Sequence, residues 1–227
     1  MVDGVDAVLF DLGGTLDGPG RPWVDRFVAA YREAGVAVPA ERLREACHAG
    51  TRAAYAEPAI AGYDLHSTVA VHVAAQLAHL GLAGPDGARR IVDIFVGGTV
   101  AALDESRAVL ERLARRYALG VVSNYYGNAD RILADAGMGQ LFAVVVDSSV
   151  CGLSKPDPAI FALAVARLGV PAQRALFVGD SLAQDIVPAR AAGLRTALVI
   201  GAGAPPETSP ADACVRDLAD VERLLVS

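Results

Sequence analysis

The chain has 227 residues, of which 53% are hydrophobic and 20% are charged, and its formal net charge is -6 at pH 7. This composition is typical of a globular protein with ample core-forming material, arranged as one large or two small domains. The acidic balance argues against nucleic-acid binding, which needs clustered Lys and Arg, so local charge must hold any anionic ligand.

The cysteines and the apolar runs bear on the cellular compartment of the protein. Cys47, Cys151 and Cys214 stand far apart, with neither metal-ligand spacing nor an even count for a disulfide framework. No apolar stretch approaches the roughly 20 residues of a membrane span, and the first apolar run is too short for a secretory signal. We therefore expect a reducing, cytoplasmic setting without a membrane partner.

The first predicted element is a strand at residues 5–10 that runs into a glycine turn. Asp11 follows the strand, and Gly13, Gly14 and Thr15 form the turn. Ligands of open α/β sheets bind at the carboxyl ends of strands, and glycines let a backbone approach a ligand closely. Asp11 and this turn are therefore expected to form part of a site, with phosphate as the favoured ligand.

About a hundred residues then pass without a convincing strand, far more than one crossover helix requires. Helical patterns occur at about residues 22–35, 40–50, 67–80 and 86–96, each bounded by Gly or Pro. They predict a helical domain at residues 18–97, inserted into a sheet domain of residues 1–17 and 98–227. Gly97 and Gly98 are expected to form the hinge, and Trp23 and Tyr31 to pack the insertion.

Further apolar runs predict the remaining strands at residues 119–122, 142–146, 175–178 and 196–200. Near-continuous apolar runs are typical of strands buried on both faces of a parallel sheet. Helical patterns at residues 105–117 and 158–168 indicate right-handed crossovers. The expected fold class is α/β, a doubly wound parallel sheet of the Rossmann-like kind with an inserted helical domain.

Polar residues follow three of the predicted strands: Asp11 the first, Ser123 and Asn124 the second, and Asp180 the run at 175–178. Each of them alone is equally typical of a helix N-cap. Asp180 and Asp185 stand five residues apart at a strand-to-helix turn. Together with Asp11 they would form an oxygen-rich pocket suited to Mg²⁺.

Lys155 lies in the segment Ser-Lys-Pro-Asp-Pro, residues 154–158, whose prolines favour a fixed loop. Close carboxylates repel one another unless a cation neutralises them. A metal ion would do so, and Lys155 would add its point charge while binding a phosphate oxygen. The alternative is a solvated loop lysine, which is the commonest fate of this residue type.

Four motifs in this order resemble those of the haloacid dehalogenase (HAD) superfamily of hydrolases. They are Phe-Asp-Leu-Gly-Gly-Thr (10–15), Val-Ser-Asn (122–124), Lys-Pro (155–156) and Gly-Asp (179–180) with Asp185. The predicted insertion resembles the family's α-helical cap of the first type, so the resemblance covers nearly the whole chain. Four ordered motifs are far more specific than any one of them.

The resemblance implies a Mg²⁺-dependent phosphatase that acts on a small phosphorylated metabolite. Asp11 would be the nucleophile that forms an aspartyl-phosphate, with Lys155 and Ser123 acting beside it. Two sets of binding residues are implied: Gly14, Thr15, Ser123, Asn124 and Lys155 for the phosphoryl group, and Asp11, the Gly13 carbonyl, Asp180 and Asp185 for Mg²⁺.

Residue 13 departs from the family pattern. Family phosphatases usually place a second aspartate there, which protonates the leaving oxygen and later activates water, a role worth about 10²–10⁴-fold. Gly13 has no group for this. Three explanations remain: an acyl, aryl or anhydride leaving group departs unassisted, another residue donates the proton, or the protein has little activity and serves as a binding or regulatory module.

The alternative donors lie near the turn and in the insertion. Asp17 is the nearest, although it is equally typical of a turn beside Gly and Pro; behind it stand Asp64, His66 and His72. A dehalogenase also needs no acid at residue 13, because halide leaves without a proton. Family dehalogenases need no metal, however, and the pair Asp180 and Asp185 would then have no purpose.

The inner face of the insertion is expected to select the substrate. Spacing does not set the oligomeric state, and it does not say which arginine would anchor an anionic substrate among Arg21, Arg26, Arg32 and Arg52. His72 and His79 are seven residues apart, too far for two metal ligands on adjacent turns, and are interpreted as helix-surface residues.

Overall fold

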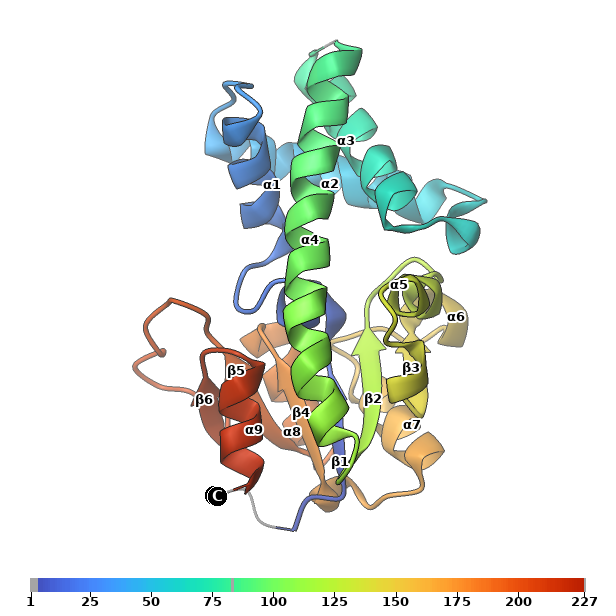
Figure 1. Cartoon of the computed structure of the whole chain (residues 1–227), viewed down its shortest axis with the longest axis vertical. Coiled ribbons are helices and arrows are strands. Elements are labelled where there is room, and N and C mark those ends of the chain that lie inside the picture. The colour runs from blue at the N-terminus through green and yellow to red at the C-terminus, as the bar shows by residue number, and fades with distance from the viewer. Residues whose placement is uncertain (1–3, 83, 227) are drawn as a thin grey trace.

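The protein contains one six-stranded parallel sheet, as seen in a computed structural model that describes residues 4–82 and 84–226. The strand order is β3-β2-β1-β4-β5-β6, and Figure 1 shows the sheet in the lower half of the molecule. This confirms the α/β class and the doubly wound parallel arrangement. The strands are β1 (Ala7–Phe10), β2 (Ala118–Ser123), β3 (Val144–Asp147), β4 (Ala175–Gly179), β5 (Arg195–Val199) and β6 (Ala213–Val215).

Helices fill the connections between the strands. Four of them, α1 to α4, lie between β1 and β2, where the sequence predicted an insertion. They are α1 (Trp23–Glu33), α2 (Ala40–Ala56), α3 (Leu65–Leu80) and α4 (Pro85–Leu113). The others are α5 (Ala129–Asp135), α6 (Ser148–Cys151), α7 (Pro158–Leu168), α8 (Val187–Ala191) and α9 (Leu218–Val226).

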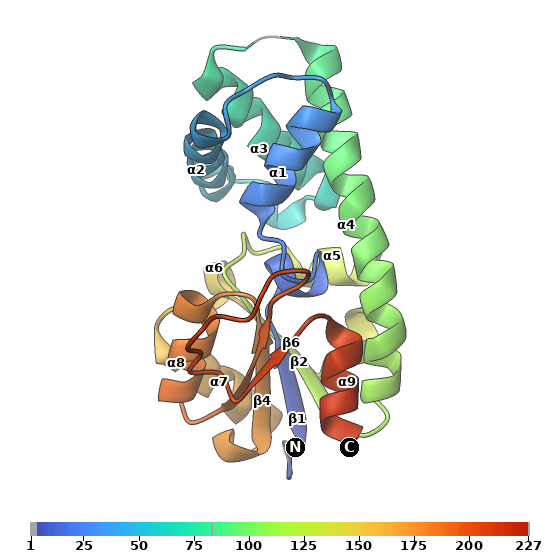
Figure 2. The same ribbon diagram turned by 90° about the vertical axis from the view of Figure 1, so that its left-hand side faces the viewer.

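The central strand β1 is buried on both faces, as its continuous apolar sequence predicted. Successive side chains of a strand point to opposite faces. Val8 and Phe10 therefore enter the core beneath α4, α5 and α9, while Ala7 and Leu9 enter the core beneath α7 and α8. Figure 2 shows the sheet between these two helical layers.

A third core lies within the helical insertion, away from the sheet. It is formed by side chains of α1, α2, α3 and the first half of α4, with Phe27, Tyr31, Leu43, Val69 and Ile91 fully or almost fully buried. The expectation that Tyr31 packs the insertion is confirmed. The helices lie beyond the carboxyl ends of the strands, so they face the sheet edge where ligands of such folds bind (Figure 1).

Helix α4 runs through Gly97 and Gly98, the expected hinge. The helix is continuous from Pro85 to Leu113 and joins the segments predicted separately at 86–96 and 105–117. Two interior glycines cost a helix about 1 kcal/mol each, but packing on either side compensates. Phe95 lies in the core of the insertion, and Leu103 lies in a core of the sheet. The proposed boundary at residues 97 and 98 therefore falls inside one helix.

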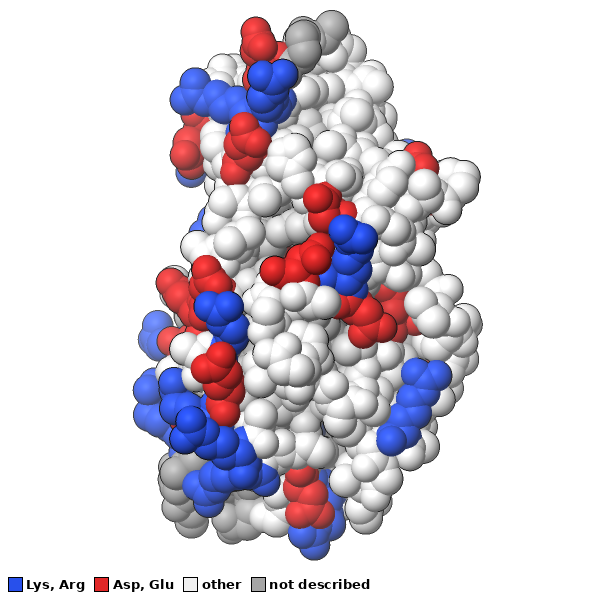
Figure 3. All heavy atoms as spheres, turned by 45° about the vertical axis from the view of Figure 1, so that its right-hand side comes forward, with Lys and Arg blue, Asp and Glu red and all other residues white. Residues whose placement is uncertain are grey.

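Two further features complete the fold. Strand β6 was not predicted, because its three residues are too few to show periodicity. Among the described residues, no helix is both long and apolar enough to cross a bilayer. On the face drawn in Figure 3, charged side chains form separate groups with large uncharged areas between them.

Candidate active site

The predicted strand-end residues converge at one edge of the sheet. Strands β2, β1 and β4 are neighbours, so their carboxyl ends bring together Ser123, Asp11 and Asp180. These three side chains line a cavity of about 890 Å³ between the sheet edge and the helical insertion. Lys155 and Asp185 line the same cavity.

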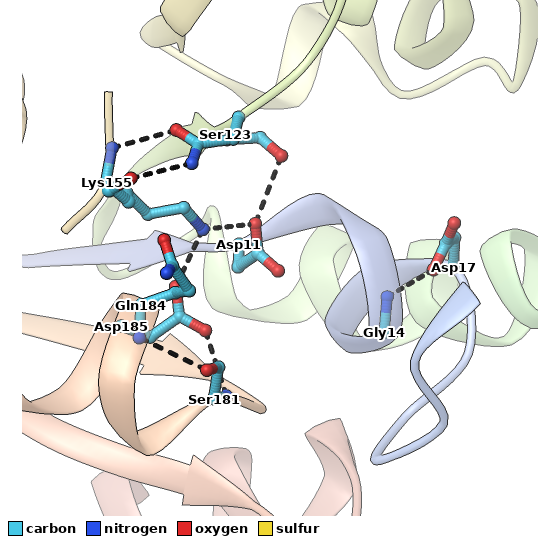
Figure 4. Close-up of polar contacts among 9 residues, drawn as sticks. Asp11, Gly14, Asp17, Ser123, Lys155, Ser181, Gln184 and Asp185 are labelled. Atoms are coloured by element: carbon cyan, nitrogen blue, oxygen red, sulfur yellow. Dashed lines mark hydrogen bonds and ion pairs between the residues drawn. The ribbon is translucent and has the colours of Figure 1, made fainter. Parts of the chain in front are cut away.

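Asp11 is held by two donors. Its Oδ1 accepts a hydrogen bond from Ser123 Oγ at 3.1 Å and another from Lys155 Nζ at 2.7 Å. Lys155 Nζ also donates to Asp185 Oδ1 at 2.7 Å, so the ammonium bridges two buried carboxylates (Figure 4). Asp11 Oδ2 accepts no hydrogen bond from the described residues and remains available for chemistry.

Lys155 is the single lysine among the 227 residues, and it is 6% exposed. Burial by itself would lower its pKa, but the carboxylates of Asp11 and Asp185 outweigh burial and hold the pKa above the ordinary value. The ammonium is therefore charged at neutral pH. The alternative of a solvated loop lysine is wrong.

Asn124 takes a different place from the one predicted. Its Nδ2 donates to the carbonyl of Lys155 at 2.9 Å, and its Oδ1 accepts from the Lys155 backbone N–H at 2.8 Å. Both ends of the amide are therefore used to fix the lysine loop against the end of β2. Asn124 lines the cavity. Its side-chain amide is mainly engaged in positioning Lys155, and only its second N–H is available to a phosphoryl oxygen.

The carboxylates fit a divalent cation. Asp11, Asp180 and Asp185 each offer one oxygen within 4.8 Å of the others. Burial first, then the neighbouring carboxylates, raises the pKa of Asp180 to about 8 and that of Asp185 to about 6. Asp185 already accepts from Lys155 and from the Ser181 N–H, whereas no described residue donates to Asp180. This donor set suits a hard cation such as Mg²⁺, with Asp180 the side chain that most needs one.

The glycine turn serves the carboxylates more directly than it serves a phosphate. Gly14 has a φ of +88°, and a Cβ there would lie 2.3 Å from Asp180 Oδ2, so only glycine permits this approach. The Gly14 N–H donates to Asp17 Oδ1 at 2.6 Å. Thr15 is fully buried, and neither Gly14 nor Thr15 lines the cavity. The structure therefore does not bring these two predicted phosphate-binding residues to the site, whereas Gly13 does line it.

Asp17 lies on the far side of the turn from Asp11 (Figure 4). It accepts hydrogen bonds from Gly14 and from Trp23 Nε1, both at 2.6 Å, and pairs with Arg26 Nη1 at 3.1 Å. Burial raises its pKa despite these three partners. Asp17 does not line the cavity, and both its oxygens are occupied, so it joins the turn to α1.

The space beside Gly13 is occupied by an aromatic ring. A Cβ at residue 13 would lie 3.5 Å from Trp23 Nε1. Trp23 packs against the core of the insertion, as expected, and it also lines the cavity. Sequence reasoning missed this neighbour because a lone tryptophan at a helix start carries no signal of the direction in which it points.

The other predicted side chains of the insertion lie elsewhere. Asp64 caps α3 by accepting from the Ser67 N–H, and His66 Nε2 lies 3.3 Å from Asp93 Oδ1, outside the cavity. Of the four candidate arginines, Arg26 is buried against Asp17, and none lines the cavity. The arginine and histidine side chains of the insertion that do line it are Arg44, His48 and His72.

His72 is buried, not on the helix surface as predicted. It is 2% exposed, lines the cavity, and neither ring nitrogen has a hydrogen-bond partner among the described residues. Burial lowers its pKa to about 4, so the imidazole is neutral at physiological pH. Its seven-residue spacing from His79 gave no hint of this environment.

Asp147, at the end of β3, is a positioning residue that the sequence analysis missed. Its carboxylate accepts from the backbone N–H groups of Gly127, Ala129 and Ser149, which fixes the loop after β2. That loop carries Tyr125 and Tyr126 into the cavity wall. The rule that located Asp11 would have found it, because Asp147 also follows a run of apolar residues.

The sheet order is that of a Rossmann-like α/β protein, and its strand ends carry a cluster of three carboxylates with one buried lysine. Residues 5–193 match the haloacid dehalogenase-like hydrolases. The chain belongs to this family of hydrolases, as its four motifs implied.

Individual relatives carry different activities. The chain is 34% identical over 60% of its length to a phosphoserine phosphatase of Thermus thermophilus, and 29% identical over 83% of its length to a phosphoglycolate phosphatase of Xanthomonas campestris. A 2-haloacid dehalogenase from Pseudomonas syringae has 26% identity and a TM-score of 0.56, with 98% of both chains covered. The matched stretches span 57% and 80% of the two phosphatases, and only 31% of another curated relative.

Proposed function

We propose that this chain is a Mg²⁺-dependent phosphatase that acts through an aspartyl-phosphate on Asp11. The observation that carries the proposal is the carboxylate cluster of Asp11, Asp180 and Asp185, in which Lys155 bridges two members and Asp180 has no donor among the described residues. Phosphoryl transfer depends chiefly on positioning and on neutralising the spread oxygen charge. Three carboxylates, one ammonium and one hydroxyl are a set suited to that task.

Asp11 would act in two steps. Its free Oδ2 attacks phosphorus, a bond forms between them, and the bond from phosphorus to the leaving oxygen breaks, so the leaving group departs as an anion. Water then attacks the same phosphorus, the bond to Asp11 breaks, and both protons of the water remain on the released phosphate. Lys155 and Ser123 hold Asp11 Oδ1 throughout, which orients Oδ2.

Mg²⁺ would be held by Asp11, Asp180 and the Gly13 carbonyl, with Asp185 close by. When bound, it would neutralise charge on the carboxylates and on the phosphoryl oxygens. We expect the helical insertion to cover the site and exclude water during reaction. The small phosphorylated substrates of the two phosphatase relatives support this interpretation.

We expect the leaving group to depart without a proton, because Gly13 supplies no acid and Asp17 does not line the cavity. An acyl, aryl or anhydride phosphate meets this requirement, since its conjugate acid is far stronger than an alkyl alcohol. A dehalogenase would meet it too, and the Pseudomonas syringae relative keeps that alternative open. The carboxylate cluster around Asp180, which suits a divalent cation, favours a phosphatase over a dehalogenase.

The test is hydrolysis of acetyl phosphate by the full chain in Mg²⁺ or in EDTA, beside Asp11→Asn. We expect turnover that requires both the metal and Asp11. Asp64→Asn, which keeps a good helix cap outside the cavity, serves as the matched control and should be fully active.

Three outcomes contradict the proposal. Turnover that survives EDTA or Asp11→Asn removes the mechanism. Binding of phosphorylated ligands without turnover indicates the binding or regulatory module. Chloride release from 2-chloropropionate without added metal indicates the dehalogenase.

A further inference from the structure

The cavity has two unlike sides, and one of them has no part in the proposed chemistry. The sheet edge supplies the charged side chains. Five aromatic side chains line the same cavity and are called here the aromatic wall: Trp23, Phe27, His72, Tyr125 and Tyr126.

We propose, building on the proposed phosphatase function, that the aromatic wall binds a planar, uncharged ring, so that the preferred substrate is an aryl phosphate monoester. The substrate would place its phosphoryl group at Asp11 and its ring against the wall. The wall residues are then specificity-determining and take no part in bond making.

The wall is continuous, although its members come from three segments of the chain. Ring centroids lie 5.4 Å apart for Trp23 and His72, 5.4 Å for His72 and Tyr126, and 5.0 Å for Tyr125 and Tyr126. Phe27 stacks on His72 at 5.9 Å. Centroid separations of about 4.5–7 Å are those at which aromatic pairs attract, so the wall is held together by its own ring contacts. Phe27, His72 and Tyr125 are at most 4% exposed, so Trp23 and Tyr126 offer the accessible ring surface.

The position of Trp23 places the wall beside the leaving group. Trp23 Nε1 lies 3.5 Å from the position that a Cβ of residue 13 would take, so the indole lines the cavity in contact range of that position. Its N–H is already donated to Asp17, so the indole presents ring carbon to the cavity and offers no proton. This environment matches an aryl oxygen, which departs as a stabilised anion.

A negative charge on the leaving group would meet few available positive charges among the described residues that line the cavity. Of its Lys and Arg residues, Lys155 is shared by Asp11 and Asp185. Arg44 is half exposed and paired with Asp25 at 2.7 Å. A carboxylate on the leaving group, as in phosphoserine or phosphoglycolate, therefore meets no unpaired arginine or lysine among the described lining residues. An uncharged ring needs none.

His72 adds a polar contact within the wall. Its neutral imidazole is almost fully buried, and both nitrogens lack partners among the described residues. Buried polar groups are nearly always hydrogen-bonded in proteins. A hydroxyl or carbonyl substituent on the bound ring would supply the missing partner without bringing a charge.

The first experiment measures binding, so it does not depend on turnover. Phenylphosphonate and methylphosphonate are titrated calorimetrically into the full chain with Mg²⁺. We expect phenylphosphonate to bind at least about tenfold tighter, the ratio that 1.4 kcal/mol of ring contact gives. Tyr126→Leu and His72→Leu should each reduce that ratio at least about threefold. The matched controls Tyr63→Leu and His66→Leu alter side chains outside the cavity and should leave it unchanged.

Equal affinity for the two phosphonates, or a ratio that both wall variants retain, overturns the inference. A second measurement compares kcat/KM for phenyl phosphate with that for O-phosphoserine, where we expect about 100-fold in favour of phenyl phosphate. Hydrolysis of acetyl phosphate without a preference for aryl phosphates would contradict ring binding by the aromatic wall but not the phosphatase function. Tighter phenylphosphonate binding without hydrolysis of any phosphate would contradict the phosphatase function but not ring binding.

Discussion

The two sides of the cavity differ in how their side chains are held. At the sheet edge Asp11, Lys155 and Asp185 form a closed set of hydrogen bonds between buried charges. The aromatic wall packs by ring contacts, and His72 has no hydrogen-bond partner in the described chain. The charged side therefore defines one reaction geometry, while the aromatic side leaves interactions open for a ligand. Under the two proposals above, the residues that determine the reaction and those that select the substrate lie in different parts of the cavity.

The largest effect is expected from removing the charge of Lys155. Lys155→Met leaves Asp11 and Asp185 buried without their shared cation, and removal of one partner from a buried ion pair costs about 3–5 kcal/mol. Acetyl phosphate hydrolysis should fall by roughly 10²–10³-fold, since a fixed electrostatic group is lost. Lys155→Arg keeps the charge but not the compact geometry, so it should recover only part of the rate. Full activity of Lys155→Met would contradict this role.

A second prediction concerns the buried ion pair between Asp17 in the glycine turn and Arg26 in α1. Asp17→Asn leaves Arg26 charged and buried, so the free energy of unfolding should drop by about 3 kcal/mol in a urea titration. The matched control is Asp25→Asn, whose ion pair with Arg44 is about half exposed and should be worth less than about 1 kcal/mol. Equal effects of the two changes would show that burial of the Asp17 pair does not matter.

Adding an acid beside the wall tests whether the leaving group needs one. Gly13 has a φ of −78°, and a Cβ added there would meet Trp23 at an ordinary contact distance, so Gly13→Asp should fold. Hydrolysis of ethyl phosphate should rise about 10- to 100-fold, within the usual range for a general acid. Acetyl phosphate hydrolysis should change little. An unchanged rate on ethyl phosphate would show that another residue already donates the proton.

The pH dependence of the charged side follows from its raised carboxyl pKa values. Asp180, with a pKa of about 8, holds its proton more tightly in the folded protein than in the unfolded chain, where carboxyls titrate near 4. The metal-free protein should therefore lose stability as pH rises from about 4 to 8. Mg²⁺ must displace this proton, so its affinity should increase at least about tenfold between pH 6 and pH 8. Melting curves with and without Mg²⁺ at both pH values test the sign, and a metal-free protein that gains stability over this range would refute it.

The smallest expected effect concerns the helix that links the two sides. Gly98→Ala places a methyl group in open space within α4 and should raise the free energy of unfolding by about 0.5–1 kcal/mol. Gly14→Ala serves as the contrast, because its Cβ would collide with Asp180, and it should lose both stability and turnover. A destabilised Gly98→Ala would indicate that α4 must bend at this point.

The charged side was largely predictable from the sequence, and the aromatic side was not. Asp11, Ser123 and Asp180 each end an apolar strand, so the topology of a parallel sheet was enough to bring them together. Lys155 was a candidate because of its proline-flanked loop, but the solvated alternative stayed open, since a loop residue carries no periodicity that indicates burial. The exact role of each residue in the turn still depended on hydrogen bonds, as the use of the Gly14 N–H by Asp17 shows.

The helical insertion shows why the rest was hidden. Helical periodicity separates buried from exposed positions, but it does not distinguish a residue buried in a core from one buried in a cavity wall. Phe27 and Tyr31 therefore look alike in sequence, although Phe27 lines the cavity and Tyr31 does not. The continuity of α4 across Gly97 and Gly98 was also missed, because tertiary packing outweighs local propensity.

The solitary lysine has a practical consequence for chemical labelling. Every other basic side chain that carries a permanent charge is an arginine, so reagents directed at ε-amino groups find a single target, and it lies between two carboxylates in the interior. Acylation of Lys155 therefore requires the ammonium to leave both carboxylates and lose its proton, so its rate reports how often this centre opens. Mass spectrometry of the intact protein would follow that rate without any substrate.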